Sequence, residues 1–286
     1  MRTETTVGRR KFVWGERTYV MGVINVSPES FAGDGLPDAE SALEQARRFV
    51  SEGADILDVG GQSTRPSTQQ AGQSGFDEVD ADEEVRRVVP AIGRIIAELD
   101  VAVSVDTYKA PVARAALGAG AHLLNDIWGF RCDPSLAHVA AEFGVPAVVM
   151  HNQRGRESTG DVIADVRTGL EASVKIAEQA GLPRERLIVD PGFGFGWTPE
   201  QNVEILRRLG ELRDLGLPIL VGTSRKSTIG AVLGGASVED RLFGTAATVA
   251  VAIANGADIV RVHDVAAMRD VARVSDAVVR GWGQAE

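Results

Sequence analysis

Eight short apolar segments alternate with helical patterns along nearly the whole chain, and this alternation constrains the fold more than any other feature. Within each segment the apolar residues run almost continuously, which is typical of strands that are buried on both faces. A polar residue lies at or near the end of each segment. The segments cover residues 19–25, 55–61, 101–107, 121–126, 146–151, 186–192, 218–224 and 258–264.

The stretches between these segments have the spacing of amphipathic helices. Residues 38–52 and 82–99 place apolar side chains three and four positions apart. Thr198 and Gln201 have the spacing of an N-cap and a capping-box glutamine, which indicates a helix start. The helix expected over 241–255 is small and apolar, so we expect it to be buried.

Strand and helix alternating eight times predict a single (β/α)8 barrel, the TIM barrel, and the length of 286 residues suits one. A doubly wound sheet is the competing fold, but it usually has fewer strands. We expect residues 1–18 to be an N-terminal extension, with a hairpin over 11–18 that closes the bottom of the barrel. Residues 19–286 would form the barrel domain, with a long mobile loop over 66–81.

Composition excludes several classes of protein. The net charge of −10 argues against a nucleic-acid partner or an anionic membrane surface. The single cysteine, Cys132, excludes an internal disulfide and a cysteine-rich metal site, and it fits a reducing cytoplasm. No apolar run approaches the roughly 18 residues of a membrane span, and the N-terminus lacks the apolar core of a signal peptide. We therefore expect a soluble cytoplasmic protein.

All strand carboxyl ends of a barrel face one mouth, where active sites are built. That rule gathers the polar residues that end the apolar segments into one set. Its members are Asn25, Asp58, Asp106, Asn125, Asp126, His151, Asp190, Lys226, Arg261 and His263, and the adjoining loops add Ser27, Ser63, Thr64, Arg65, Arg225 and Ser227.

A purely structural role remains open for some of these residues. Asp58 and Asp126 would then cap the turns that follow them or pair with a neighbouring arginine. His151 has a structural and a functional interpretation that the sequence does not separate. His122 and His138 lie away from strand ends, so we interpret both as structural.

Four of the mouth residues suit a flat heterocycle rich in N–H groups. Asp106, Asn125 and Asp190 offer acceptors and donors for the ring, and Lys226 offers a cation for a ring carbonyl oxygen. The pair Arg225-Lys226 follows a buried strand and is either a solvated edge or an anion-binding or ring-binding site.

A second group suits a phosphate or diphosphate. Arg65, Arg261 and His263 offer charge-assisted donors, and Asn25 is a neutral oxygen ligand for one vertex of a water-rich Mg²⁺ shell. No Walker loop, H-E-x-x-H, C-x-x-C or nucleophile elbow is present, and the glycines of residues 192–196 lack the spacing of a dinucleotide fingerprint.

Motifs in order along the chain now point to a known family. They are M-G-V-I-N-V-S-P-E-S-F, D-V-G-G-Q-S-T-R-P, S-V-D-T, N-D-I, M-H, D-P-G-F-G-F-G, G-T-S-R-K-S and R-V-H-D-V. Each motif alone is weak, but the ordered set, over about residues 19–275, resembles that of the dihydropteroate synthases. That family joins 6-hydroxymethyl-7,8-dihydropterin diphosphate to p-aminobenzoate and releases diphosphate.

The resemblance implies a role for each matching residue, a Mg²⁺ cofactor and a homodimer formed through the late helices. The pterin pocket would use Asp106, Asn125, Asp190 and Lys226, with Ile127 and Met150 beside the ring. Diphosphate would be held by Thr64, Arg65, Arg261, His263 and a Mg²⁺ on Asn25. Aminobenzoate would lie near Thr64, Pro66, Phe195 and Ser227. Catalysis would depend on Arg261, His263, Lys226 and Asp106, while Arg225 would support the others from behind.

The sequence departs from the family pattern in two loops. The first loop reads E-S-F-A-G-D-G over 29–35, and Gln62 and Ser67 replace the usual glutamate and glycine. We expect these changes on the aminobenzoate side, where sulfonamides compete, and therefore an altered sulfonamide sensitivity. Two alternatives remain, a pterin-dependent methyltransferase barrel and a noncatalytic pterin-binding homologue. The first would not need the anion-binding cluster.

Overall fold

The computed structural model of the chain describes residues 4–27, 35–63 and 78–282. Its main sheet has eight parallel strands in the order β8-β7-β6-β5-β4-β3-β10-β9. A bridge between Val189 and Ile219 joins the two outer strands and closes the barrel. The strands are β3 Tyr19–Asn25, β4 Ile56–Gly60, β5 Ala102–Asp106, β6 Leu123–Asp126, β7 Ala147–Met150, β8 Leu187–Asp190, β9 Leu220–Val221 and β10 Ile259–Val262.

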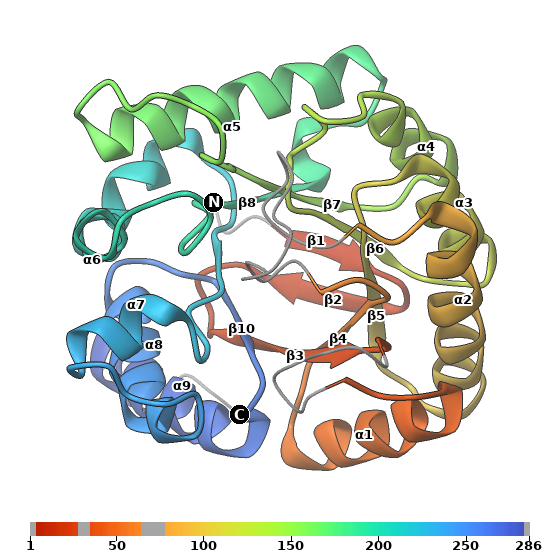
Figure 1. Cartoon of the computed structure of the whole chain (residues 1–286), viewed down its shortest axis with the longest axis horizontal. Coiled ribbons are helices and arrows are strands. Elements are labelled where there is room, and N and C mark those ends of the chain that lie inside the picture. The colour runs from red at the N-terminus through yellow and green to blue at the C-terminus, as the bar shows by residue number, and fades with distance from the viewer. Residues whose placement is uncertain (1–3, 28–34, 64–77, 283–286) are drawn as a thin grey trace.

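Helices surround the strands, as Figure 1 shows, so the predicted (β/α)8 barrel is confirmed. The α-helices are α1 Ala39–Glu52, α2 Ala81–Glu98, α3 Ala110–Gly118, α4 Ser135–Phe143, α5 Val162–Gln179, α6 Pro199–Arg207, α7 Ser227–Val232, α8 Leu242–Ala254 and α9 Val265–Arg280. Short 3₁₀ helices cover Arg184–Arg186, Leu209–Leu215 and Glu239–Arg241. The capping box predicted at Thr198 and Gln201 is present at the start of α6.

Helix α8 is less buried than predicted. Thr245, Val249 and Ile253 are buried, but Phe243 is 85% exposed and Val251 is 45% exposed. The prediction of a buried helix was therefore wrong for one of its faces, because an apolar composition does not show which face of a helix the barrel covers. Within the described residues, no helix is both long and apolar enough to cross a membrane.

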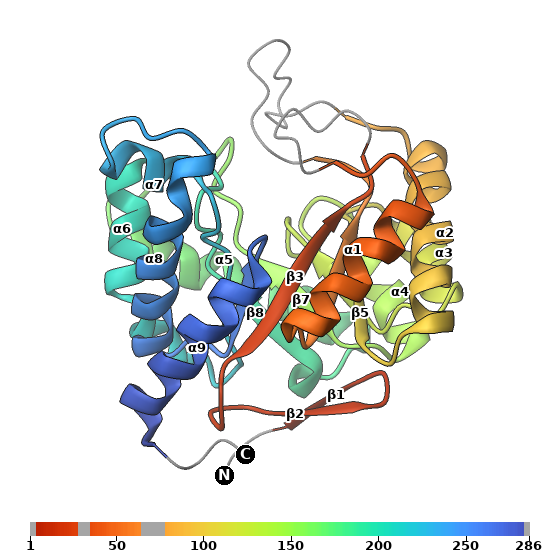
Figure 2. The ribbon, with the colours of Figure 1, turned by 90° about the horizontal axis from the view of Figure 1, so that it is seen from below.

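The N-terminal hairpin lies earlier than the predicted 11–18. Strands β1 (Glu4–Val7) and β2 (Arg10–Val13) pair antiparallel, and residues 14–18 lead into β3 instead. Figure 2 shows this hairpin across the end of the barrel at which β3 begins. Its Val7 and Phe12 join one buried apolar cluster with barrel residues, among them Ile56 of β4. The hairpin thus seals the amino-terminal end of the barrel.

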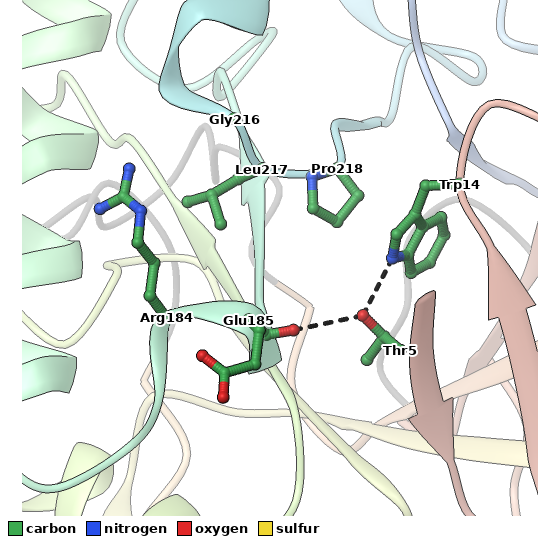
Figure 3. Close-up of a pocket in the computed structure, with 7 residues that line it drawn as sticks. All are labelled: Thr5, Trp14, Arg184, Glu185, Gly216, Leu217 and Pro218. Carbon is green, nitrogen blue, oxygen red and sulfur yellow. Dashed lines mark hydrogen bonds between the residues drawn. The ribbon is translucent and has the colours of Figure 1, made fainter. Parts of the chain in front are cut away.

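One edge of this seal is visible in Figure 3. The Trp14 Nε1–H donates to Thr5 Oγ1 at 2.9 Å, and the Thr5 hydroxyl donates to the carbonyl oxygen of Glu185 at 3.3 Å. A small pocket beside these residues is also lined by Arg184 and Pro218, which precede strands β8 and β9. It therefore lies at the end of the barrel opposite to the predicted mouth, and it carries none of the predicted site residues.

Candidate active site

Strand register brings the predicted pterin residues to one rim. Asp106 at the end of β5 is the direct neighbour of Asn125 on β6, and Met150 at the end of β7 is the neighbour of Asp190 on β8. Arg261 on β10 reaches the same place, because its guanidinium bonds to the Asp106 carboxylate at 2.7 Å. Residues that are far apart in the sequence thus converge at the carboxyl ends of the strands.

A cluster of buried charges centres on Arg261. Its Nε–H donates to Asp58 Oδ2 at 2.6 Å, and the same oxygen accepts a hydrogen bond from Asn125 Nδ2 at 2.9 Å. Burial opposes the charge on Arg261, but the carboxylates of Asp58 and Asp106 prevail and raise its pKa. Burial also raises the pKa of Asp106, although Arg261 pulls in the opposite direction. The arginine therefore stays charged between two carboxylates.

Lys226 enters the mouth from the loop after β9. Its Nζ donates to the carbonyl oxygen of Phe193 and lies 4.5 Å from the ring centroid of Phe195. Burial lowers the pKa of Lys226 to about 7, against the attraction of Asp190. Burial in turn raises the pKa of Asp190, against the attraction of Lys226. The charge of each group thus opposes the effect of burial on the other.

The loop after β8 owes its shape to glycine. Gly192 has φ +76°, and a Cβ there would lie 1.8 Å from the carbonyl oxygen of His151, so no other residue fits. The Gly192 N–H donates to Asp190 Oδ1 at 2.7 Å. This loop fixes the Asp190 carboxylate and brings the Phe193 carbonyl to Lys226, which gives the glycine-rich stretch a role without any nucleotide.

Arg225 supports its neighbours, as predicted. It has φ +58°, unusual for a residue other than glycine, and it forms an ion pair with Asp264. Its backbone N–H donates to Thr245 Oγ1 at 3.1 Å. The preceding Ser224 hydroxyl lies 2.9 Å from His263 Nδ1. The strained loop therefore presents Ser224 to His263 and Lys226 to the mouth.

An apolar cluster forms another part of the mouth. Ile127 and Met150 pack together, and Tyr108, Trp128 and Phe195 pack against them. Flat and flexible side chains of this kind suit the face of a ring.

The structure separates some polar strand-end residues from this site. Asp126 accepts hydrogen bonds from the backbone N–H groups of Trp128 and Phe130, at 2.8 and 2.6 Å, so it caps the turn. His151 is 2% exposed, and its Nε2 lies 2.9 Å from Gln153 Oε1. Burial lowers the pKa of His151 to about 4. Both residues are structural here, and so is His122, whose Nδ1 accepts the N–H of Val103.

Some predictions fall outside what the structure describes. Thr64, Arg65 and Pro66, with Ser67 and residues 28–34, lie outside the described ranges. Ser227 is the exposed first residue of α7, a helix of six residues. Gln62 is described, and its Oε1 accepts a hydrogen bond from Lys109 Nζ at 2.6 Å.

Asn25 is the expected Mg²⁺ ligand, and it stands half-buried at the end of β3. Among the described residues, no group of three or more His, Cys, Asp or Glu side chains could hold a metal ion. An all-protein cage is therefore absent from the described part. The donor set fits Mg²⁺ only as an ion that keeps most of its water and binds one protein oxygen together with a phosphate.

From the sequence, Asp58 has both a structural and a functional interpretation, and Ser224 is not among the predicted site residues. Asp58 bonds two predicted site residues, and Ser224 orients a third. The strand period could have indicated Asp58, because Ile56, Asp58 and Gly60 share the inward face of β4.

Comparison with known proteins agrees with this geometry. Residues 21–263 match the family model described as "Pterin binding enzyme". The dihydropteroate synthase of Clostridium beijerinckii is 45% identical over 276 residues, which cover 96% of this chain and 99% of that protein. Two crystal structures are similar over nearly their whole length.

One is a dihydropteroate synthase from Clostridium difficile in the presence of pteroic acid, with a TM-score of 0.87 and 46% identity, covering 94% of this chain and 99% of the other. The other is the Xanthomonas albilineans enzyme with 4-aminobenzoic acid, with a TM-score of 0.88 and 40% identity, covering 97% of this chain and 98% of the other. Fold, site geometry and sequence thus lead to one conclusion: this chain belongs to the dihydropteroate synthase family of pterin binding enzymes.

Proposed function

We propose that this protein condenses 6-hydroxymethyl-7,8-dihydropterin diphosphate with p-aminobenzoate, giving 7,8-dihydropteroate and diphosphate. The observation that carries the proposal is the convergence of Arg261, Asp106, Asn125, Asp190 and Lys226 at one rim of the barrel. A ring-binding set and an anion-binding arginine lie in direct contact there, and this reaction needs both.

The pterin would lie on the apolar cluster of Ile127 and Met150, with its polar edge toward the carboxylates and the amide. Asp106 and Asp190 accept from ring N–H groups, and Lys226 donates to the ring carbonyl oxygen. These carboxylates also place negative charge beside a ring that becomes cationic as the leaving group departs. Catalysis then follows from positioning and electrostatics.

The reaction breaks the bond between the methylene carbon and the diphosphate oxygen. The bonding electrons leave with diphosphate, whose charge Arg261 and His263 stabilise, as would Thr64 and Arg65. The aminobenzoate nitrogen forms the new bond with its lone pair and then loses a proton. A neutral amine needs orientation more than activation, so no general base is required.

Aminobenzoate would lie near Phe195 and Ser227, with Thr64 and Pro66 on its other side. Phe195 supports this placement, because two cations at the mouth contact its ring: Lys226 Nζ lies 4.5 Å and the Arg154 guanidinium carbon 4.8 Å from the ring centroid. Asn25 would hold one vertex of a Mg²⁺ ion, which when bound supplies positive charge for the diphosphate.

The deciding experiment measures diphosphate release with each substrate alone and with both together. Release that needs both, with stoichiometric dihydropteroate, is the expected result. A pterin-dependent methyltransferase would instead transfer a methyl group from a methylated pterin. A noncatalytic homologue would bind the pterin without turnover, so each alternative has its own readout.

We propose in addition that sulfonamides inhibit this enzyme weakly. Gln62 supports the proposal, since this neutral amide takes a hydrogen bond from Lys109, which also pairs with Glu84 at 2.6 Å. A glutamate at position 62 would change the charge balance directly before the loop that carries Thr64. The test compares the inhibition constant of a sulfonamide for the wild type and for Gln62→Glu. Tighter inhibition of the variant supports the proposal, and equal inhibition contradicts it.

We propose that the protein forms a homodimer through α8 and α9. Large apolar side chains are exposed on both helices, including Phe243 at 85% and Val278 at 80%. The two helices pack side by side in Figures 1 and 2. Light scattering should give a dimer for the wild type and a monomer for Val278→Glu. Val203→Glu, on α6, is the matched control and should remain dimeric.

A cytoplasmic location completes the proposal. Cys132 is the single cysteine of the chain and is exposed as a free thiol, which suits a reducing compartment. Cell fractionation that recovers the protein with the membrane or outside the cell would contradict it.

A further inference from the structure

We propose that Asp58 is a positioning residue that ties the pterin-binding amide of Asn125 to the anion-binding guanidinium of Arg261. Asp58 is 0% exposed and lies in the middle of β4. One of its oxygens, Oδ2, accepts hydrogen bonds from both residues, at 2.9 Å from Asn125 Nδ2 and 2.6 Å from Arg261 Nε. The inference rests on the proposed function and assigns a role to a residue beneath that site.

The order of the strands shows what this shared oxygen connects. In the sheet the strands lie in the order β6-β5-β4-β3-β10. Asn125 therefore lies two strands to one side of Asp58, and Arg261 lies two strands to the other. Neither bond therefore joins adjacent strands. Asp58 spans the inside of the barrel and links two parts of the rim that the backbone ladder connects only through intervening strands.

For Asn125, the bond to Asp58 selects one orientation of the amide. A carboxylate accepts and cannot donate, so it binds the Nδ2 end and turns Oδ1 away from itself. The amide then presents an acceptor to the mouth, which complements the N–H groups of a pterin. Without the carboxylate, the amide could turn its NH₂ end toward those same N–H groups, where donor would meet donor.

For Arg261, the bond fixes the plane of the guanidinium. Nε donates to Asp58 on β4 and Nη2 donates to Asp106 on β5. Two nitrogens of the planar guanidinium are thus held by carboxylates on different strands. A guanidinium held at two points presents its remaining surface to the leaving group without reorganisation. Asp58 thereby prepares both the ring-binding and the anion-binding part of the site.

The chain offers a matched control in Asp126. It is 1% exposed, and like Asp58 it accepts two hydrogen bonds, from Trp128 N and Phe130 N. These donors are backbone groups of a turn, not side chains of the site. Asp126→Asn therefore removes an equally buried charge with equally many hydrogen bonds, but it leaves Asn125 and Arg261 in place.

The experiment compares the wild type, Asp58→Asn and Asp126→Asn. Calorimetry measures the binding of 6-hydroxymethyl-7,8-dihydropterin and of inorganic diphosphate separately, and kinetics give kcat and both KM values. We expect Asp58→Asn to weaken both probes about tenfold, to lower kcat, and to leave the aminobenzoate KM within about twofold. Asp126→Asn should change the melting temperature but neither affinity.

Weakening of only one probe by Asp58→Asn, or equal weakening by Asp126→Asn, would overturn the proposal. If Asp58→Asn does not fold, Asp58→Ser, which keeps an acceptor in a smaller volume, takes its place. The wild type supplies a further test that needs no variant at position 58. In its ¹⁵N NMR spectrum, the pterin probe alone should shift the Nε–H signal of Arg261, assigned with Arg261→Lys, and an unmoved signal would contradict the link.

The probe-binding measurements separate this inference from the proposed function. If the wild type binds both probes but does not condense the substrates, the proposed reaction fails while the role of Asp58 is still tested. If condensation occurs and Asp58→Asn leaves both probes unaffected, the role of Asp58 fails and the reaction stands.

Discussion

The two ends of the barrel use the same strands in opposite ways. On β4, Ile56 packs into the apolar layer beneath the hairpin, whereas Asp58, the next inward-facing residue, bonds Arg261 and Asn125. On β5 the same step leads from the buried Ala102 to Ser104 and then to Asp106. Every second side chain of a strand points into the barrel. One strand therefore supplies an apolar residue to the base, the end of the barrel under the hairpin, and a polar residue to the rim, the end where the strands finish.

This difference has an energetic consequence. The base buries apolar surface, which stabilises the fold, and it contains no predicted site residue. At the rim, burial raises the pKa of Asp106 and Asp190 and lowers the pKa of Lys226, so it opposes the charged form of each. We therefore expect changes at the base to alter stability without affecting catalysis, and changes at the rim to do the reverse.

The largest expected effect is at the base. Phe12 is 2% exposed and contacts the rings of Trp14 and Tyr19, with centroids 5.9 and 4.7 Å away. Phe12→Ala should lower the free energy of unfolding by about 4 kcal/mol, because a cavity replaces a buried ring. Denaturant titration measures this value, and kcat/KM at 25 °C should stay within about twofold.

The adjacent Lys11 provides the control for this substitution. Its ion pair with Glu4 is exposed, so Lys11→Ala should change the free energy of unfolding by less than about 0.5 kcal/mol. A large loss of activity in Phe12→Ala, under conditions where the protein remains folded, would show that base and rim are coupled.

The next effect is at the rim. Arg261→Lys keeps the charge between Asp58 and Asp106 but cannot reproduce a fork held at two points. We expect kcat/KM for the pterin substrate to fall about 100-fold, or about 2.7 kcal/mol. The free energy of unfolding should change by about 1 kcal/mol or less. If the free energy of unfolding falls as far in Arg261→Lys as in Phe12→Ala, the contrast between base and rim is wrong.

The same contrast explains what the sequence could predict. The base and the barrel follow from local patterns, such as the apolar runs and the cap at Thr198, so the fold and the helix starts are confirmed. The hairpin position was wrong because an apolar stretch such as F-V-W does not specify its partner strand. The β1-β2 turn falls at residues 8–9, and Gly8 has a positive φ.

At the rim, the sequence predicted which residues gather but not how they connect. Asp106, Asn125, Asp190, Lys226 and Arg261 converge as expected. The equivocal Asp58 bonds Arg261 across 203 positions of the chain, a contact that exists only once the barrel closes. The strand period places Asp58 on the inward face of β4, but both Asp58 and Asp126 are acidic residues in strands, and only the closed barrel shows which donors each one meets.

A smaller effect concerns the pH dependence of the rim. The pKa of Lys226 is lowered to about 7 by burial, so its ammonium is charged below this pH and neutral above it. Under the proposed function, kcat/KM for the pterin substrate should fall about tenfold per unit as pH rises above about 7. In Lys226→Arg this fall of kcat/KM above pH 7 should disappear, because a guanidinium keeps its charge throughout that pH range. If kcat/KM of the variant still falls in the same way above pH 7, a group other than Lys226 causes the pH dependence.

The smallest effect tests the strain that the rim carries. Arg225 has φ +58° and pairs with Asp264, with side chains 30% and 24% exposed. Arg225→Ala and Arg225→Gly both remove the ion pair, but only glycine adopts this conformation without steric cost. The glycine variant should therefore be more stable by about 1 kcal/mol, as measured by denaturant titration.

The pair of variants also separates strain from positioning. If the left-handed turn is what presents Ser224 and Lys226, both variants should keep a similar pterin KM, because neither needs a different backbone path. A rise in KM confined to Arg225→Ala would mean that the loop relaxes away from this conformation once the ion pair is gone. The contact with Asp264 would then be what maintains the strained turn, and the rim would depend on a partly buried ion pair in a way that the base does not.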